Sequence, residues 1–236
     1  MGLALGSFLG ALTYRLARKE SFVKGRSGCP RCGANIKWYD NVPVLSFLLL
    51  GGRCRSCHKK ISLRDPLIEI VTALGVLGIY LSNLEFPLFL IFILLATISI
   101  FVIDLENEII PDELIFLGLG VTTMALLLGW NGSFYLHFLG GFSSSLFLLL
   151  INLITKSKGM GLGDVKYALF AGTFLGFPKS VSWLFLSFLT GASLGVILIL
   201  LGRARLGKHI PFGPFLAASF LVTAIFGENL VKWLIG

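Results

Sequence analysis

Long apolar runs constrain this sequence more than any other feature. Residues 87–103 contain no charged side chain, and a helix of about 20 apolar residues crosses the roughly 30 Å hydrocarbon core of a bilayer. Across the 236 residues, 56% are hydrophobic and 14% are charged. A soluble domain of this size could not bury so many apolar side chains. We therefore expect an all-α polytopic membrane protein.

About eight transmembrane helices are expected from these runs. The first and sixth runs are short, so each is expected to be truncated, tilted or only partly inserted. The short connections after the second, fourth and sixth runs contain Asn, Gly, Pro and Ser, which suits tight turns between antiparallel helices. The runs are residues 2–16, 66–81, 87–103, 113–130, 134–155, 164–177, 181–201 and 212–235.

Lysine and arginine in the loops predict the orientation. If the spans alternate, residues 15–64, 156–166 and 203–208 place their basic side chains on one side, and only Lys179 and Lys232 lie on the other. Cytoplasmic loops are enriched in these residues, so the basic side is predicted to be cytoplasmic. This topology, with contact to anionic lipid heads, accounts for the net charge of +8 without a nucleic-acid partner.

All four cysteines lie in a polar, basic segment, residues 17–65. We expect this segment to be a small cytoplasmic domain between a first transmembrane segment, residues 1–16, and a multi-helix membrane domain, residues 66–236. Cys29-Pro30-Arg31-Cys32 and Cys54-Arg55-Ser56-Cys57 are C-x-x-C pairs separated by 21 residues. Two such turns facing each other complete a tetrahedral site, which predicts a structural zinc bound by Cys29, Cys32, Cys54 and Cys57.

Two disulfides or a redox dithiol are the competing interpretations of these cysteines. The reducing cytoplasm disfavours structural disulfides, and a redox role would not need two matched pairs. His58 directly follows the second pair and is expected to point away from the metal.

Two aspartates are candidate site residues. Asp104 ends an apolar run where the helix dipole disfavours a negative charge, so a purely structural role is hard to assign. Asp164 follows Gly159-Met160-Gly161-Leu162-Gly163; it suits an ordinary helix N-cap, but the alternating glycines also allow the backbone to approach another group closely. The glycines do not fit the G-x-G-x-x-G spacing of a dinucleotide site. The topology places both acids at the cytoplasmic face, where they can meet.

Two other segments near helix starts have simpler interpretations. Asp112 follows Pro111 and precedes an apolar run, which suits an N-cap. Pro211-Phe212-Gly213-Pro214 is expected to be a plain helix start, although this break in the chain could also line the cytoplasmic mouth of a site. His209 precedes it.

Paired carboxylates suggest acid–base catalysis. Two that lie close together cannot easily both ionise, so they share a proton. One then takes a proton from water attacking a peptide carbonyl, while the other donates a proton to the carbonyl oxygen and later to the leaving amine. The alternative is a proton-coupled or cation transporter with a cytoplasmic zinc module. The absence of a convincing internal repeat and the position of both acids at the membrane edge favour the protease.

The sequence resembles the type IV prepilin leader peptidases, which are bacterial membrane aspartic proteases of the G-x-G-D class. The resemblance covers nearly the whole chain and rests on the order and spacing of its motifs. They are Gly6-Ser7-Phe8-Leu9 with Tyr14-Arg15-Leu16, the two cysteine pairs, Asp40-Asn41-Val42-Pro43 with Leu45-Ser46-Phe47, Gly52-Arg53-Cys54, Ile61-Ser62 with Arg64 and Pro66, Asp104 followed by Ile110-Pro111-Asp112, and Gly161-Leu162-Gly163-Asp164-Val165-Lys166.

The resemblance implies that Asp104 and Asp164 are the catalytic aspartates. It implies an enzyme of the bacterial inner membrane that cuts prepilins and pseudopilins after a short basic leader, typically between glycine and phenylalanine. Members of the family often also methylate the new N-terminal amine with S-adenosylmethionine, an activity associated with an insertion such as residues 17–65. Two positions depart from the usual family pattern: Gly10 stands where asparagine is usual, and Asp65 where an aromatic residue is common.

Overall fold

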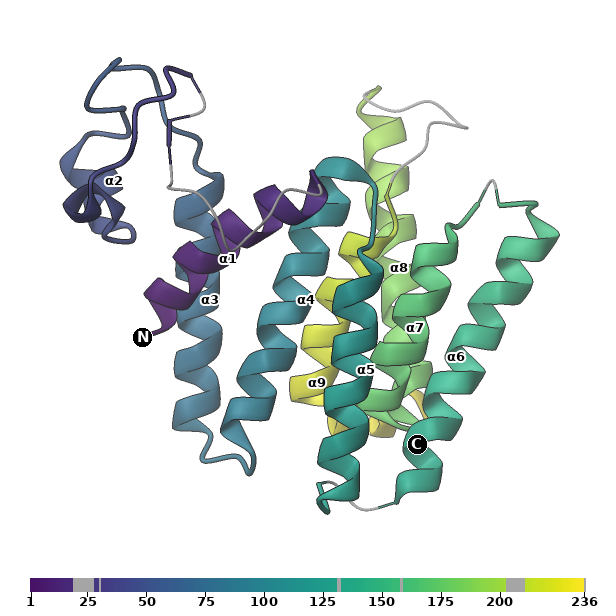
Figure 1. The fold of residues 1–236 in the computed structure, drawn as a ribbon. Helices are drawn as coiled ribbons and strands as arrows, with labels where there is room; N and C mark the ends of the chain where they lie inside the picture. The colour runs from purple at the N-terminus through teal and green to yellow at the C-terminus, as the bar shows by residue number, and fades with distance from the viewer. Residues whose placement is uncertain (19–27, 30, 131–132, 158, 203–210, 236) are drawn as a thin grey trace. The chain divides into compact units, whose positions relative to one another are not determined.

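The computed structural model describes residues 1–18, 28–29, 31–130, 133–157, 159–202 and 211–235 (Figure 1). Within these ranges the regular structure is helical, apart from two isolated β-bridges that join Gly28 to Asn35 and Arg53 to Lys60. The all-α expectation is therefore confirmed for the described residues. Arg203, Arg205 and Lys208, which support the predicted orientation, lie outside the described residues, as does His209.

Each of the eight expected runs forms a helix. A 3₁₀ helix, η1 (Trp38–Asn41), and a short helix, α2 (Leu45–Leu49), lie in the segment that carries the cysteines. The eight longer helices are α1 (Gly2–Ala17), α3 (Arg64–Leu81), α4 (Pro87–Asn107), α5 (Asp112–Leu127), α6 (Phe134–Ile154), α7 (Leu162–Leu175), α8 (Lys179–Leu200) and α9 (Gly213–Ile235).

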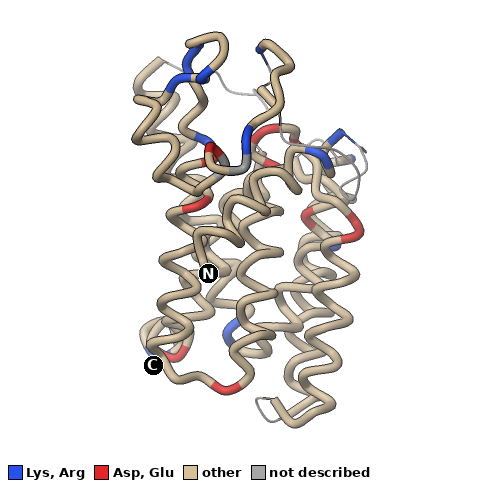
Figure 2. The backbone as a smooth tube through the Cα atoms, turned by 60° about the vertical axis from the view of Figure 1, so that its left-hand side comes forward, with Lys and Arg blue, Asp and Glu red and all other residues tan. Residues whose placement is uncertain are grey.

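Four of these helices, α4, α6, α8 and α9, are long and apolar enough to cross a membrane by themselves. Helices α1, α5 and α7 have 16, 16 and 14 residues, which is short for a hydrocarbon core of about 30 Å. Charged residues lie mainly near the helix ends and in the connections, and most of each helix is uncharged (Figure 2). The structure thus supports a multi-span membrane protein, with four spans identified by length and composition.

The chain divides into two compact units, Met1–Ser99 and Ile100–Gly236, and the division falls within α4. Helix α3 belongs to the first unit, together with α1 and the cysteine-containing segment. The domain boundaries expected after residues 16 and 65 stay predictions.

In the first unit, small residues bring α1 directly against α3. A Cβ atom added to Gly2 would lie 2.7 Å from the Cα of Ala73, and one added to Gly6 would lie 2.5 Å from the Cα of Glu69. Both distances are shorter than real contacts allow, so glycine is required at this crossing. The Arg64 guanidinium also donates to the Gly10 carbonyl oxygen at 3.1 Å. The small residues near the N-terminus therefore pack α1 against α3.

In the second unit, α7 is held between α5 and α6. A Cβ on Gly172 of α7 would lie 2.6 Å from the carbonyl oxygen of Gly140 on α6, so these two backbones are in contact. On the other side, Gly118 of α5 leaves space for the ring of Phe170, which is fully buried. This packing fixes the axis of α7 and therefore the position of its first turn.

Candidate active site and cysteine cluster

Asp104 lies in the last turn of α4, which continues past the apolar run to Asn107. Its side chain is buried, with 6% of the residue exposed. The Asp104 carbonyl oxygen accepts the N–H of Glu108 at 2.9 Å, and Glu108 has a positive φ of 55°, which ends the helix. The chain then turns into α5, and the carboxyl group is left at the C-terminal end of a buried helix.

Asp164 is the third residue of α7, because this helix begins two residues earlier than expected. Gly161 is the N-cap, and its N–H donates to Oδ2 of Asp164 at 3.1 Å. The N-cap interpretation of Asp164 is therefore wrong. The N–H of the N-cap residue Gly161 has no acceptor within the helix. The carboxylate of Asp164 in the first turn accepts this hydrogen bond. The Asp164 residue is 7% exposed.

The glycine-rich loop before Asp164 is held from α6. The side-chain amide of Asn152 donates to the Met160 carbonyl oxygen at 2.6 Å, and Asn152 and Met160 are both buried. The loop carrying the G-x-G-D sequence is thus fixed on one side by a buried hydrogen bond and on the other by the hydrogen bond between Gly161 and Asp164.

The segment between α4 and α5 packs against the first turn of α7. A Cβ added to Gly163 would lie 3.2 Å from the Cβ of Ile110, so glycine allows this close approach. Lys166 Nζ lies 2.8 Å from both carboxylate oxygens of Asp112. Both side chains are about half exposed, so this ion pair adds little stability by itself. These contacts bring together the motifs Ile110-Pro111-Asp112 and Gly161-Leu162-Gly163-Asp164-Val165-Lys166, which are about fifty residues apart in the sequence.

Asp112 is the first residue of α5 rather than its N-cap, which is Pro111. Pro111 has φ −66° and ψ 127°, and the fixed φ of proline suits the extended conformation that precedes a helix. The expected capping role of Asp112 is therefore wrong, and its carboxylate instead pairs with Lys166.

Asp104 and Asp164 line one cavity of about 330 Å³ in the second unit. The structure therefore brings together the two aspartates singled out in the sequence. The cavity wall also includes Pro211 and Phe212, which lie just before α9, where the sequence predicted a plain helix start. The only available signal was the proline-glycine break in the chain. The lining residues are Asp104, Glu108, Ile109, Ile110, Asp112, Gly161, Leu162, Gly163, Asp164, Lys166, Pro211 and Phe212.

The first unit contains the four cysteines in one cluster. Their sulfur atoms all lie within 4.8 Å of one another, and the Sγ atoms of Cys29 and Cys57 are 4.0 Å apart. Zinc–sulfur bonds of about 2.3 Å in a tetrahedron place sulfur atoms about 3.8 Å apart. The donor set and its spacing therefore fit a tetrahedral metal ion.

Both cysteine pairs use the same turn. The Cys29 N–H donates to the Ala34 carbonyl oxygen and the Gly33 N–H donates to the Cys29 carbonyl oxygen, at 2.9 and 2.8 Å. Cys54 repeats this pattern with Lys59 and His58, both at 2.9 Å. Because the two turns are equivalent, the four thiols converge in two matched pairs.

His58 has a structural place in the second of these turns. It has a positive φ of 55°, at the position where the first turn has Gly33 with φ 71°. Its ring is not part of the cluster of ligand atoms formed by the described cysteines. This agrees with the expectation that His58 points away from the metal.

Backbone hydrogen bonds prepare one thiol for metal binding. N–H groups of Arg31 and Cys32 lower the pKa of Cys29 to about 6, which favours the thiolate, the form that binds metal.

Asp40 connects the second cysteine turn to η1. Arg55, which lies between Cys54 and Cys57, donates to both carboxylate oxygens of Asp40, at 2.7 to 3.1 Å. These hydrogen bonds hold the pKa of Asp40 below its ordinary value. A bidentate pair of this kind fixes orientation as well as contributing energy.

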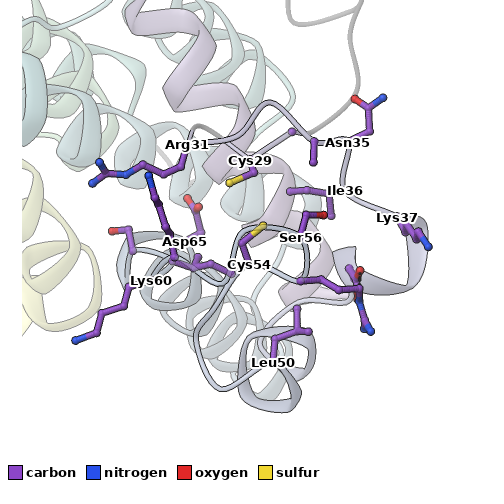
Figure 3. A pocket seen from close by; sticks show the side chains of 17 residues that line it. Cys29, Arg31, Asn35, Ile36, Lys37, Leu50, Cys54, Ser56, Lys60 and Asp65 are labelled. Carbon is purple, nitrogen blue, oxygen red and sulfur yellow. Dashed lines mark hydrogen bonds and ion pairs between the residues drawn. The ribbon is translucent and has the colours of Figure 1, made fainter.

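A second cavity, of about 410 Å³, adjoins the cysteine cluster in the first unit. In Figure 3, Lys37 and Lys60 extend in opposite directions from its rim, while Cys29 and Cys54 mark its boundary with the cluster. Asp40 and Asp65 are its acidic residues, and its apolar surface comes from Ile36, Leu50 and Ile61. This is large enough for a ligand of small-molecule size.

The long apolar helices are those of a helical membrane protein. Two buried aspartates, each near the end of a helix, line one cavity, and this places the protein among membrane proteins with a pair of aspartates at one site. Comparison with known families makes this more specific. A model described as the Bacterial Peptidase A24 N-terminal domain matches residues 1–83. A model described as the Type IV leader peptidase family matches residues 88–196.

Relatives similar over nearly the whole chain carry the name prepilin leader peptidase/N-methyltransferase. The one from Pseudomonas aeruginosa is 32% identical, over 98% of this chain and 90% of its own. Those from Legionella pneumophila and Bacillus subtilis are each 33% identical, over 99% of this chain and 92% and 95% of their own. No solved structure matches the chain. The chain belongs to the type IV leader peptidase family, as the motifs indicated.

Proposed function

We propose that this protein is a membrane aspartic endopeptidase that removes the leader peptide from type IV prepilins and pseudopilins. The observation that carries the proposal is the placement of Asp104 and Asp164 on one cavity, within a chain of the leader peptidase family. Family membership favours a peptidase over the transporter that the residues alone left open.

Asp104 and Asp164 are the proposed catalytic pair. In the first step, one carboxylate removes a proton from water as the water oxygen bonds to the scissile carbonyl carbon, and the other, protonated, gives its proton to the carbonyl oxygen. In the second step, a proton returned to the amide nitrogen allows the C–N bond to break, which yields a carboxyl product and an amine.

The two helices suggest how the roles divide. Asp164 lies in the first turn of α7, where the helix dipole stabilises a negative charge, whereas Asp104 lies in the last turn of α4, where the dipole opposes one. We therefore assign the base to Asp164 and the proton donor to Asp104 at the start of the reaction.

The lining of the cavity suits the substrate expected for the family. Glu108 offers negative charge to a basic leader, and Ile110, Leu162 and Phe212 offer apolar surface to a phenylalanine beside the cut. Charge complementarity of this kind acts mainly on association and register.

The proposed location is the bacterial inner membrane, with the cavity and the cysteine domain on the cytoplasmic side. The distribution of basic residues supports this orientation. Prepilin substrates and surrounding lipids are then the partners, and a substrate must present its scissile bond at the cytoplasmic interface.

We propose zinc as the metal of the cysteine cluster, because four thiolates in a closed tetrahedral arrangement are typical of structural zinc. The segment is too small to bury much core, so bound metal would stabilise its fold.

The names of the relatives support a second activity, N-methylation of the new N-terminus. S-adenosylmethionine would supply the methyl group. The 410 Å³ cavity beside the cysteine cluster is the proposed binding site. Carboxylates of Asp40 and Asp65 can face the ribose hydroxyls or the cationic end of this cofactor, and the lysines on the rim can face its carboxylate.

Cleavage of a prepilin in one membrane preparation tests the peptidase. Asp104→Asn and Asp164→Asn should each reduce cleavage at least about 100-fold, because asparagine keeps the shape but cannot share the proton. Asp112→Asn is the matched control and should retain most activity, since it removes only an exposed ion pair.

If Asp104→Asn still cuts, the pair is wrongly assigned and Asp112 becomes the candidate. If the wild type cuts no pilin-like substrate, the peptidase proposal fails. The same aspartate variants, given a pilin that is already cleaved and labelled S-adenosylmethionine, should still transfer methyl, because the proposed methylation site uses neither aspartate. A wild type that cleaves but transfers no label would remove the second activity.

A further inference from the structure

The start of α9 lies directly against the carboxyl group of Asp104. A Cβ atom added to Gly213 would lie 2.7 Å from Cγ of Asp104 and closer still to its Oδ2. Gly213 is buried, and real Cβ atoms essentially never approach other heavy atoms closer than 3.0 Å. The Asp104 carboxyl group therefore occupies the space that any side chain at position 213 would need.

The first turn of α9 is fixed in place and cannot easily move away. The N–H groups of Phe215 and Leu216 donate to the Phe212 carbonyl oxygen, at 3.0 and 3.2 Å. The Phe212 ring packs on Phe188 of α8 with 5.0 Å between centroids.

A second anchor joins α9 to α8 one turn further along. The indole N–H of Trp183 donates to the Leu216 carbonyl oxygen at 2.9 Å, and both residues are fully buried. A side chain at position 213 would therefore displace Asp104 rather than α9.

We propose that the first turn of α9 is a third component of the peptidase site and that Gly213 is a positioning residue for Asp104. The inference rests on the proposed catalytic role of Asp104. The backbone of Gly213 limits the positions that the Asp104 carboxyl group can adopt. Pro211 and Phe212, which adjoin this turn, line the cavity. Displacing a reacting group by about 1 Å can cost about 100-fold in rate.

Gly213→Ala tests this directly, with Gly120→Ala as the matched control. Gly120 lies in α5 of the same unit, is exposed, and has no atom within 4 Å of an added Cβ. Gly213→Ala should lower kcat for prepilin cleavage by about 10- to 100-fold with little change in KM. It should also shift the pH profile of kcat, because displacing Asp104 changes the distance between the two carboxyl groups and therefore how they share a proton. Gly120→Ala should leave both unchanged.

A double-mutant cycle separates displacement of Asp104 from general damage to the fold. Asp104→Ala removes the atoms nearest to the new methyl group. The thermal unfolding midpoint should therefore fall clearly when Gly213→Ala is made in the wild type, and by less than half as much when it is made in Asp104→Ala. If Gly213→Ala alone does not fold, Asp104→Ala/Gly213→Ala should still be recovered folded.

Wild-type kcat and pH profile in Gly213→Ala would overturn the proposal. So would equal destabilisation in both backgrounds, or failure of the double variant to fold, because each would show that the alanine acts without Asp104. If Asp104→Asn retains cleavage, the catalytic assignment fails instead, and the cycle still reports whether Gly213 and Asp104 are in contact.

Discussion

Replacing Gly172 by alanine should weaken the interface between α6 and α7. The added Cβ would lie 2.6 Å from the Gly140 carbonyl oxygen and 2.9 Å from the Cα of Gly141. These are backbone atoms, so no side chain can rotate to make room. The helices must separate by roughly 0.8 Å to restore ordinary contact, which loosens packing along the interface.

The size of the effect follows from two opposing terms. Overpacking a well-packed interface costs about 1–3 kcal/mol, and the contact with backbone places this substitution near the upper end. Alanine regains up to about 1 kcal/mol over glycine through its helix propensity. We therefore expect a net destabilisation of about 1–2 kcal/mol.

Gly120→Ala is again the control, because its Cβ meets open space and only the favourable helix term remains. The two variants should differ by about 2–3 kcal/mol, or roughly 4–12 °C in unfolding midpoint for a chain of this size. Tryptophan fluorescence at one scan rate and in one detergent gives the comparison. A Gly172→Ala midpoint equal to or above that of Gly120→Ala would refute the direct contact between these backbones.

Two further predictions concern the cysteine domain. Cys29→Ser and Cys54→Ser should each lose the metal and become sensitive to protease within this domain, because three thiolates leave the tetrahedral site open; wild-type protein with no bound metal and four free thiols would contradict the zinc assignment. Arg55 lowers the pKa of Asp40. The charged pair therefore stabilises the folded domain when the pH is above the ordinary pKa of aspartate. This stabilisation is lost as the pH falls through the lowered pKa of Asp40. Asp40→Asn should therefore be more protease-sensitive than the wild type at neutral pH, and the difference should disappear in acid; a difference that does not depend on pH would show that the charge of Asp40 is not what matters.

Features that depend on composition and periodicity could be predicted from the sequence. Runs of apolar residues longer than a dozen leave few alternatives to a helix in a membrane, and all eight runs are helices. The spacing of the cysteine pairs predicted their cluster because each C-x-x-C turn is a local structure. The aspartates could be placed on one side because their positions relative to the spans follow from alternation alone.

Features that depend on single backbone groups could not be predicted in this way. Gly161 caps α7 without a side chain, so nothing in the sequence marked the helix start two residues before Asp164. The contact between Gly213 and Asp104 joins residues more than a hundred positions apart. A helix start that forms a wall of a cavity has the same local sequence as one exposed to solvent.

The two departures from the usual family pattern illustrate the same limit. Gly10 and Asp65 are distant in the sequence, and each suggests an independent change. In the structure, a Cβ on Gly10 would lie 3.1 Å from Oδ1 of Asp65, and that oxygen accepts a hydrogen bond from Arg64 at 2.7 Å. Arg64 also donates to the Gly10 carbonyl oxygen at 3.1 Å. A larger residue at position 10 would crowd this carboxylate, so the glycine and the aspartate are compatible as a pair, and together they keep the arginine of α3 bound to α1.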